Sequence, residues 1–130
     1  MANNENSVIT DYRREKLCKI TSGEISTLPH ITHVAFGDGG VDGSGDPIPP
    51  VGSANALTHE LARYAINGVT YPVPTTARYT ATIPANDLAG AEISEAALVD
   101  GDGELCAVKT MFVKRKDAGV TFTFTFDDEF

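Results

Sequence analysis

The sequence lacks long apolar runs, a paired-cysteine pattern and a secretory signal. No stretch of about eighteen consecutive apolar residues occurs, so we expect no membrane-spanning helix. The two cysteines, Cys18 and Cys106, are far apart and show no Cys-x-x-Cys spacing, which predicts reduced, partly buried thiols and no disulfide. Residues 1–7 are polar and rich in asparagine, so we expect the chain to be made and folded in a cytoplasm.

Positive charge is also scarce. The 130 residues include 10 Lys and Arg against 18 Asp and Glu, which gives a net charge of -8 at pH 7. An acidic surface repels phosphate backbones and anionic lipids, so we expect neither nucleic acid nor a membrane as a partner. The length suits one hydrophobic core, which predicts a single domain over residues 1–130. Within it we expect residues 1–6 to be disordered and residues 37–52 to form a long surface loop rich in glycine and proline.

Two segments have the spacing of amphipathic helices. Between Ser7 and Ser22, apolar residues recur at roughly helical intervals, which predicts an N-terminal helix. Ser7 or Thr10 is suited to the N-cap, and Gly23 supplies the left-handed residue that commonly ends a helix. From Ala54 to Ile66, a similar spacing predicts a short central helix, followed by a turn at residues 67–68.

The rest of the sequence is typical of strands. Two apolar runs flank a short acidic turn at Asp100–Glu104, which predicts a β-hairpin, and alternation is clearest in the last strand. The predicted strands are Ile31–Phe36, Thr76–Ile83, Ile93–Val99, Leu105–Val113 and Val120–Phe126. We therefore predict an α+β, mainly β fold: an antiparallel sheet or β-sandwich with a C-terminal meander, one N-terminal helix and one short central helix.

Two hypotheses concern side chains that must be covered. Phe122, Phe124 and Phe126 share one face of the last strand, so they must pack in the core or against another subunit, and we mark them as an interaction strand. Glu95 shares a face with apolar neighbours, so a buried Glu95 would need a cationic partner. We expect Arg63 to form this structural ion pair, unless Glu95 faces solvent instead.

No group of residues is typical of a catalytic, cofactor or metal site, so we expect none of these and no enzymatic activity. His30 and His33 would point to opposite faces of a strand, and His59 is remote in sequence. The carboxylates of Asp100–Glu104 resemble only a fragment of a calcium loop. The alternative function is a small carbohydrate- or calcium-binding β-sandwich, for which Tyr71 is the candidate exposed aromatic residue.

Four motifs in order carry a resemblance to a known family. They are Ile-Thr-His-Val-Ala-Phe-Gly-Asp-Gly-Gly from residue 31, Leu-Thr-His-Glu-Leu-Ala-Arg from residue 57, Ile-Pro-Ala from residue 83, and Ile93 to Leu105. Together they resemble the N-terminal, tail-attachment domain of phage tail-collar fibre proteins, found in phages, prophages and phage-tail-like particles. The resemblance implies a structural subunit of a phage tail or contractile injection system, a tail-collar, fibre or baseplate-associated attachment protein that acts through protein–protein contacts.

The same resemblance implies where the protein works and with which partners. The expected location is the tail of a virion or phage-like particle, after synthesis in the bacterial cytoplasm. The expected partners are other tail or baseplate proteins and further copies of this chain, with a trimer favoured among homo-oligomers.

Overall fold

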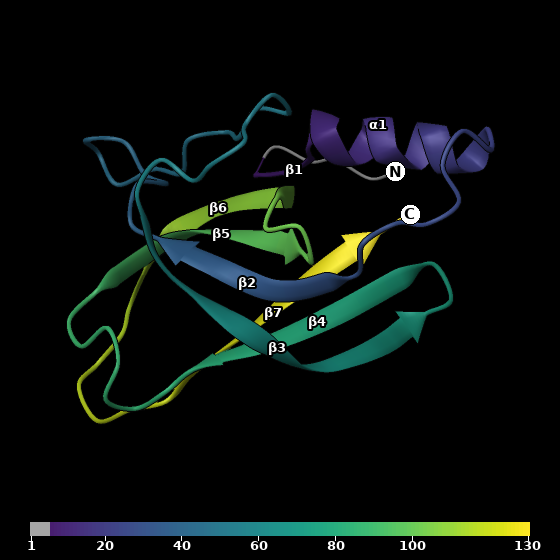
Figure 1. Ribbon diagram of the computed structural model, residues 1–130. Helices are drawn as coiled ribbons and strands as arrows, with labels where there is room; N and C mark the ends of the chain where they lie inside the picture. Colours follow the sequence, from purple (N-terminus) through teal and green to yellow (C-terminus); the bar gives the residue numbers. More distant parts are fainter. Residues whose placement is uncertain (1–5) are drawn as a thin grey trace.

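The computed structural model describes residues 6–130, which form one α-helix and one antiparallel sheet of seven strands (Figure 1). The elements are β1 (Ser7–Ile9), α1 (Asp11–Thr21), β2 (Ile31–Gly37), β3 (Glu60–Val73), β4 (Thr76–Ile83), β5 (Glu92–Asp100), β6 (Leu105–Arg115) and β7 (Phe122–Glu129). The predicted mainly β, antiparallel fold is confirmed. The disorder predicted for residues 1–6 falls largely on residues 1–5, outside the described residues. The carbonyl of Asn6 accepts a hydrogen bond from the Thr110 N–H.

The sheet is strongly curled, with the strand order β1-β6-β5-β2-β3-β4-β7 (Figure 1). Its inner face holds the larger core, in which Phe36 makes an edge contact with Phe124 at 5.5 Å between ring centres. A smaller cluster on the other face includes Ala35, Ala97 and Leu57, and Leu57 comes from the segment between β2 and β3. That segment therefore covers the outer face of the central strands. Among the described residues, its one isolated β-bridge is antiparallel and joins Val41 to Pro47.

The second predicted helix is wrong, because residues 60–66 begin the long strand β3. Leu61 and Tyr64 fit a helical spacing, but Tyr64 and Ile66 also fit the period of two that a strand requires, and both pack against the inner core. The predicted turn at residues 67–68 is instead an irregularity in the β3–β4 pairing between Ile66 and Gly68. A glycine within a strand is often the mark of such a bulge.

The predicted C-terminal meander is only half right. The hairpin of β5 and β6 forms as expected, but β7 pairs with β4 in an unbroken register from Thr76↔Glu129 to Ile83↔Phe122. This crossing brings the aromatic face of β7 onto Phe36. Within residues 6–130, the short strand β1 is the one outer neighbour of β6, so the last residues of β6 reach solvent and Phe112 is 65% exposed.

The N-terminal helix is confirmed, although it begins later than predicted because residues 7–9 form β1. Thr10 is the N-cap: its hydroxyl oxygen accepts from the Arg13 N–H at 3.3 Å and its hydroxyl donates to the Leu105 carbonyl at 2.7 Å. Gly23 has a φ of 85° just after the helix, as expected. The buried Thr10 thereby fixes the start of α1 to β6 and sets the direction in which Arg13 points.

Candidate functional site

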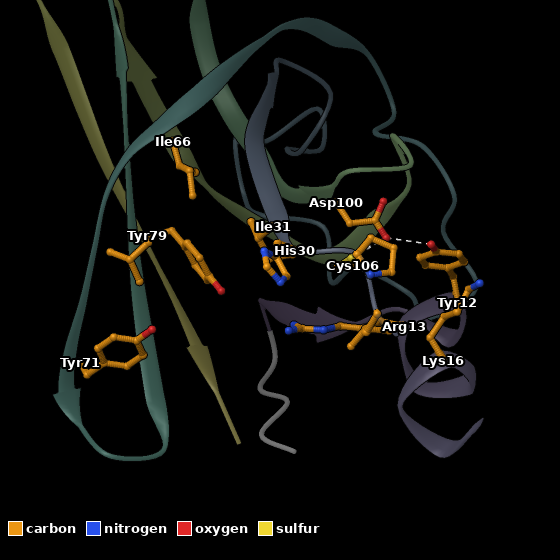
Figure 2. A pocket seen from close by; sticks show the side chains of 13 residues that line it. Tyr12, Arg13, Lys16, His30, Ile31, Ile66, Tyr71, Tyr79, Asp100 and Cys106 are labelled. Carbon is orange, nitrogen blue, oxygen red and sulfur yellow. Dashed lines mark hydrogen bonds between the residues drawn. The ribbon is translucent and has the colours of Figure 1, made fainter. Parts of the chain in front are cut away.

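A cavity of about 400 Å³ opens between α1, the segment before β2 and the outer end of the β3–β4 hairpin (Figure 2). On the helix side it is lined by Tyr12, Arg13 and Lys16. On the hairpin side it is lined by Ile66, Val69, Tyr71 and Tyr79. Its volume lies in the range of pockets that hold small ligands or side chains, and its walls combine aromatic and cationic groups.

A buried ion pair fixes the base of the helix wall. Arg13 contacts Asp128 on β7 through both ends of its guanidinium: Nη1 lies 2.7 Å from Oδ1, and Nη2 lies 2.7 Å from Oδ2. Both side chains are almost fully buried, and the ring of Phe130 lies 5.1 Å from the guanidinium carbon. Burial alone would lower the pKa of Arg13, but the hydrogen bond and charge of Asp128 outweigh it and raise the pKa. Arg13 is therefore a charged structural group whose partner is already in place.

A second contact closes the far side of the cavity. The Tyr12 hydroxyl donates a hydrogen bond of 2.7 Å to the Asp100 carboxylate, as the dashed line in Figure 2 shows. Burial and this hydrogen bond raise the pKa of Tyr12 above its ordinary value. The other Asp100 oxygen accepts from the N–H groups of Asp102 and Glu104, which forms the predicted hairpin turn. The buried Asp100 is thus occupied by the protein's own donors, which gives no support to the calcium-loop alternative.

Both cysteines are free, as predicted, but they differ in exposure. Cys106 is buried beside Asp100, whereas Cys18 is exposed, so the expectation of partial burial is wrong for Cys18. Burial first, and then the charge of Asp100, raise the pKa of the Cys106 thiol to about 12.

This difference predicts selective labelling. Because the thiolate is the reactive form, iodoacetamide at about pH 8 should modify Cys18 in the native chain and leave Cys106 unmodified. Mass spectrometry should find one adduct in the folded protein and two after denaturation. A Cys18→Ser variant is the control and should remain unlabelled while folded. Equal rates of modification at both native thiols would contradict the burial of Cys106.

Glu95 is buried as expected, but its partners are not cationic. One carboxylate oxygen accepts from the Thr58 N–H and the other from the N–H groups of Gly39 and His59, each at 2.9 Å. Arg63 instead contacts Glu60 and the Gly103 carbonyl. The predicted Arg63–Glu95 ion pair therefore does not form within residues 6–130. The physical reason is that residues 60–66 form a strand and not a helix. Its register places Arg63 opposite Ala35 of β2, whereas Glu95 is opposite Gly37, two residues further along β2.

The aromatic strand is covered within its own chain. Phe124 and Phe126 are buried in the inner core, and Phe122 is partly buried against it. The alternate residues of β7, including Thr123 and Thr125, are exposed. Packing in the core accounts for the aromatic pattern, and a role of these three residues in partner contact stays a prediction.

The histidines do not come together. His30 lies at the cavity, His33 contacts the Thr32 hydroxyl, and His59 contacts the Asp38 carboxylate at the surface. Among residues 6–130 no three histidine, cysteine or acidic side chains gather in an arrangement that would hold a metal ion. The same part of the chain has no helix of sufficient length and apolar character to span a membrane.

Sequence reasoning identified few residues of this cavity. Tyr71, the candidate exposed aromatic residue of the carbohydrate-binding alternative, is 70% exposed, and it lies near the end of strand β3. The alternation of Val69, Tyr71 and Val73 was a usable signal for a strand with an apolar face. The position of α1 across the cavity from this face depends on tertiary structure, so no local sequence pattern predicts it.

One comparison with known proteins gives a match. The family model described as "Phage tail-collar fibre protein, N-terminal" matches residues 1–121 of the 130 residues. No curated protein and no solved structure matches the chain.

Proposed function

This chain belongs to the phage tail-collar fibre family, matched by its N-terminal model, and from this membership we propose that it attaches a fibre or collar component to a phage or phage-like tail. The family model, which covers most of the chain, supports a structural role in a phage tail and is the observation that carries the proposal. In this role the protein acts through protein–protein contacts, at the collar or the baseplate, in the tail of a virion or of a contractile injection particle.

The geometry of the cavity favours a binding function over a catalytic function. Two of its buried ionisable groups, Arg13 and Asp100, are held by Asp128 and Tyr12. Catalysis requires polar groups that converge on a reacting atom, and groups already paired with one another do not provide this. We therefore propose that the protein is not an enzyme and that it works without a cofactor.

Exposed apolar side chains support assembly into a larger structure. They are Ile48, Val51, Val69, Tyr71, Val73, Phe112, Val113, Val120 and Phe130. Single exposed apolar residues are ordinary on protein surfaces, but adjoining ones, such as Val69, Tyr71 and Val73 on β3, are typical of a surface that contacts a partner. We propose that the partners are tail or baseplate proteins and further copies of this chain, with a trimer as the favoured homo-oligomer, and not nucleic acid or membrane.

Particle purification tests the proposed function. The chain, carrying a small affinity tag, would be expressed together with the tail genes that neighbour its own gene, and assembled tails would be isolated by sedimentation. We expect the chain to sediment with the tails in a fixed ratio, and deletion of its gene to give tails without attached fibres under the electron microscope. Tails that carry fibres normally in the deletion strain would contradict the proposal.

A further inference from the structure

The outer half of β3 has a hydrogen-bonded neighbour on one side only. β2 pairs with β3 as far as His33↔Ala65, whereas β4 continues beside β3 to Val73↔Thr76. Before Ile31 the chain leaves the sheet, so no described strand lies beside residues 66–73 on that side. The cavity of Figure 2 occupies this place, with Tyr71 of β3 on one side and His30, just before β2, across from it. The edge of β3 at residues 66–73 is therefore free to pair with another strand, which would lie in line with β2.

The side chains along this open edge are apolar. Val69, Tyr71 and Val73 are 39%, 70% and 51% exposed, and they alternate along the strand. An open strand edge with apolar side chains is a template for pairing, and proteins usually blunt such edges with charge or cover them. Residues 66–75 contain no charged residue, and the two residues without a backbone N–H, Pro72 and Pro74, both lie at the hairpin end, beyond residues 66–71. The matching occupant is an extended chain that supplies both backbone hydrogen bonds and alternate side chains.

Charge at the cavity indicates which extended chain would fit. Arg13 and Asp100 already have partners, whereas Lys16 forms no salt bridge within residues 6–130 and lies 5.7 Å from the centre of the Tyr12 ring. A carboxylate on the occupant would complement Lys16. A second copy presenting the same edge would not supply one, because residues 66–75 contain no acidic side chain.

We propose that this edge binds an extended segment of another tail protein by β-strand addition. The segment pairs with residues 66–71 of β3, places an apolar side chain in the cavity between Tyr71 and α1, and places a carboxylate beside Lys16. The identity of the partner as a tail protein rests on the proposed function, whereas the pairing mode rests on the open edge.

Selection from a displayed library of random octapeptides tests the pairing mode on the whole chain. Selected peptides should share alternating apolar residues and one acidic residue. Because a strand presents its amides alternately to its two sides, N-methylation of every second amide in a selected peptide should abolish binding for one set and spare it for the other. A selection without a shared pattern, or equal effects of both methylated sets, would overturn the proposal.

Two substitutions locate the binding. Tyr71→Ala and Lys16→Glu should each weaken a selected peptide by about tenfold or more, since each removes an anchor of the kind that dominates peptide binding. The matched controls are Phe112→Ala, which removes another exposed aromatic ring, and Arg14→Glu, which reverses an exposed charge on the same helix. Both controls should bind as the parent does, with unchanged thermal melting in all four variants. Equal binding by Tyr71→Ala and the parent would overturn the proposal.

The remaining outcomes separate this inference from the proposed function. If light scattering finds an oligomer of the parent chain that Tyr71→Ala dissociates, the edge binds a second copy and the inference is wrong. If the chain sediments with tails while the peptide results are negative, the inference fails and the tail function stands. If peptides bind as expected but the chain is absent from tails, the tail function fails and the open edge remains a peptide-binding site.

Discussion

Replacement of Glu95 by alanine is expected to lower the free energy of unfolding by about 3–4 kcal/mol, because it leaves three partly buried N–H groups without their charged acceptor. These donors belong to Gly39, Thr58 and His59, at the two ends of the segment that covers the outer face of the sheet. Loss of one side chain therefore frees both ends of the segment together. Thermal unfolding should show a decrease in Tm of roughly 10–15 °C.

Matched variants distinguish the lost acceptors from a general effect of mutation. Glu92→Ala removes an exposed carboxylate on the same strand and should change stability by less than about 0.5 kcal/mol. Glu95→Gln keeps one acceptor oxygen but turns an amide donor towards another donor, so its loss should be intermediate. A Glu95→Ala chain as stable as Glu92→Ala would show that the three N–H groups find other acceptors at little cost.

The glycines near Glu95 explain why the segment approaches so closely. A Cβ atom added to Gly40 would lie 2.1 Å from the Ser94 carbonyl oxygen, and one added to Gly37 would lie 2.5 Å from the His59 carbonyl oxygen. The Gly40 N–H also donates to the Ser94 hydroxyl at 2.9 Å. The glycine-rich sequence that predicted a loop is thus also needed for close backbone contact with β5.

Local patterns predicted the elements whose side chains alternate or whose turns are short. The predicted strand Thr76–Ile83 has the observed bounds of β4, because its alternation is clean and Pro84 cannot continue a ladder. The β5–β6 hairpin was predicted from the acidic turn between two apolar runs. In these cases the structure-forming information lies within about ten residues of the element itself.

Features that depend on distant segments could not be read from the sequence in the same way. β7 pairs with β4, and nothing in the alternation of Phe122, Phe124 and Phe126 specifies that neighbour. For Glu95, burial was predictable from its apolar neighbours, but its partners are backbone N–H groups of a segment whose path has no sequence pattern. The cavity likewise requires α1 and the β3–β4 hairpin, which are distant in the sequence, to line opposite sides of one space.

The ion pair between Arg13 and Asp128 joins the N-terminal helix to the C-terminal strand, and breaking it should have the second large effect. Asp128→Ala leaves the buried guanidinium without its carboxylate, and we expect a loss of about 2–4 kcal/mol in the free energy of unfolding. Because Arg13 also lines the cavity, peptide binding at the open edge should weaken in the same variant.

The neighbouring pair Arg78–Asp127 provides the control for this prediction. It has similar geometry, with contacts of 2.7 and 3.0 Å, but its side chains are 43% and 37% exposed. Asp127→Ala should therefore cost no more than about 0.5–1 kcal/mol. The double variant Arg13→Met with Asp128→Leu should recover much of the lost stability, since paired apolar replacements remove both buried charges. The free energies of unfolding would be measured by urea unfolding. If Asp128→Ala and Asp127→Ala lose equal stability, the buried ion pair contributes no more than the exposed one and the prediction is wrong.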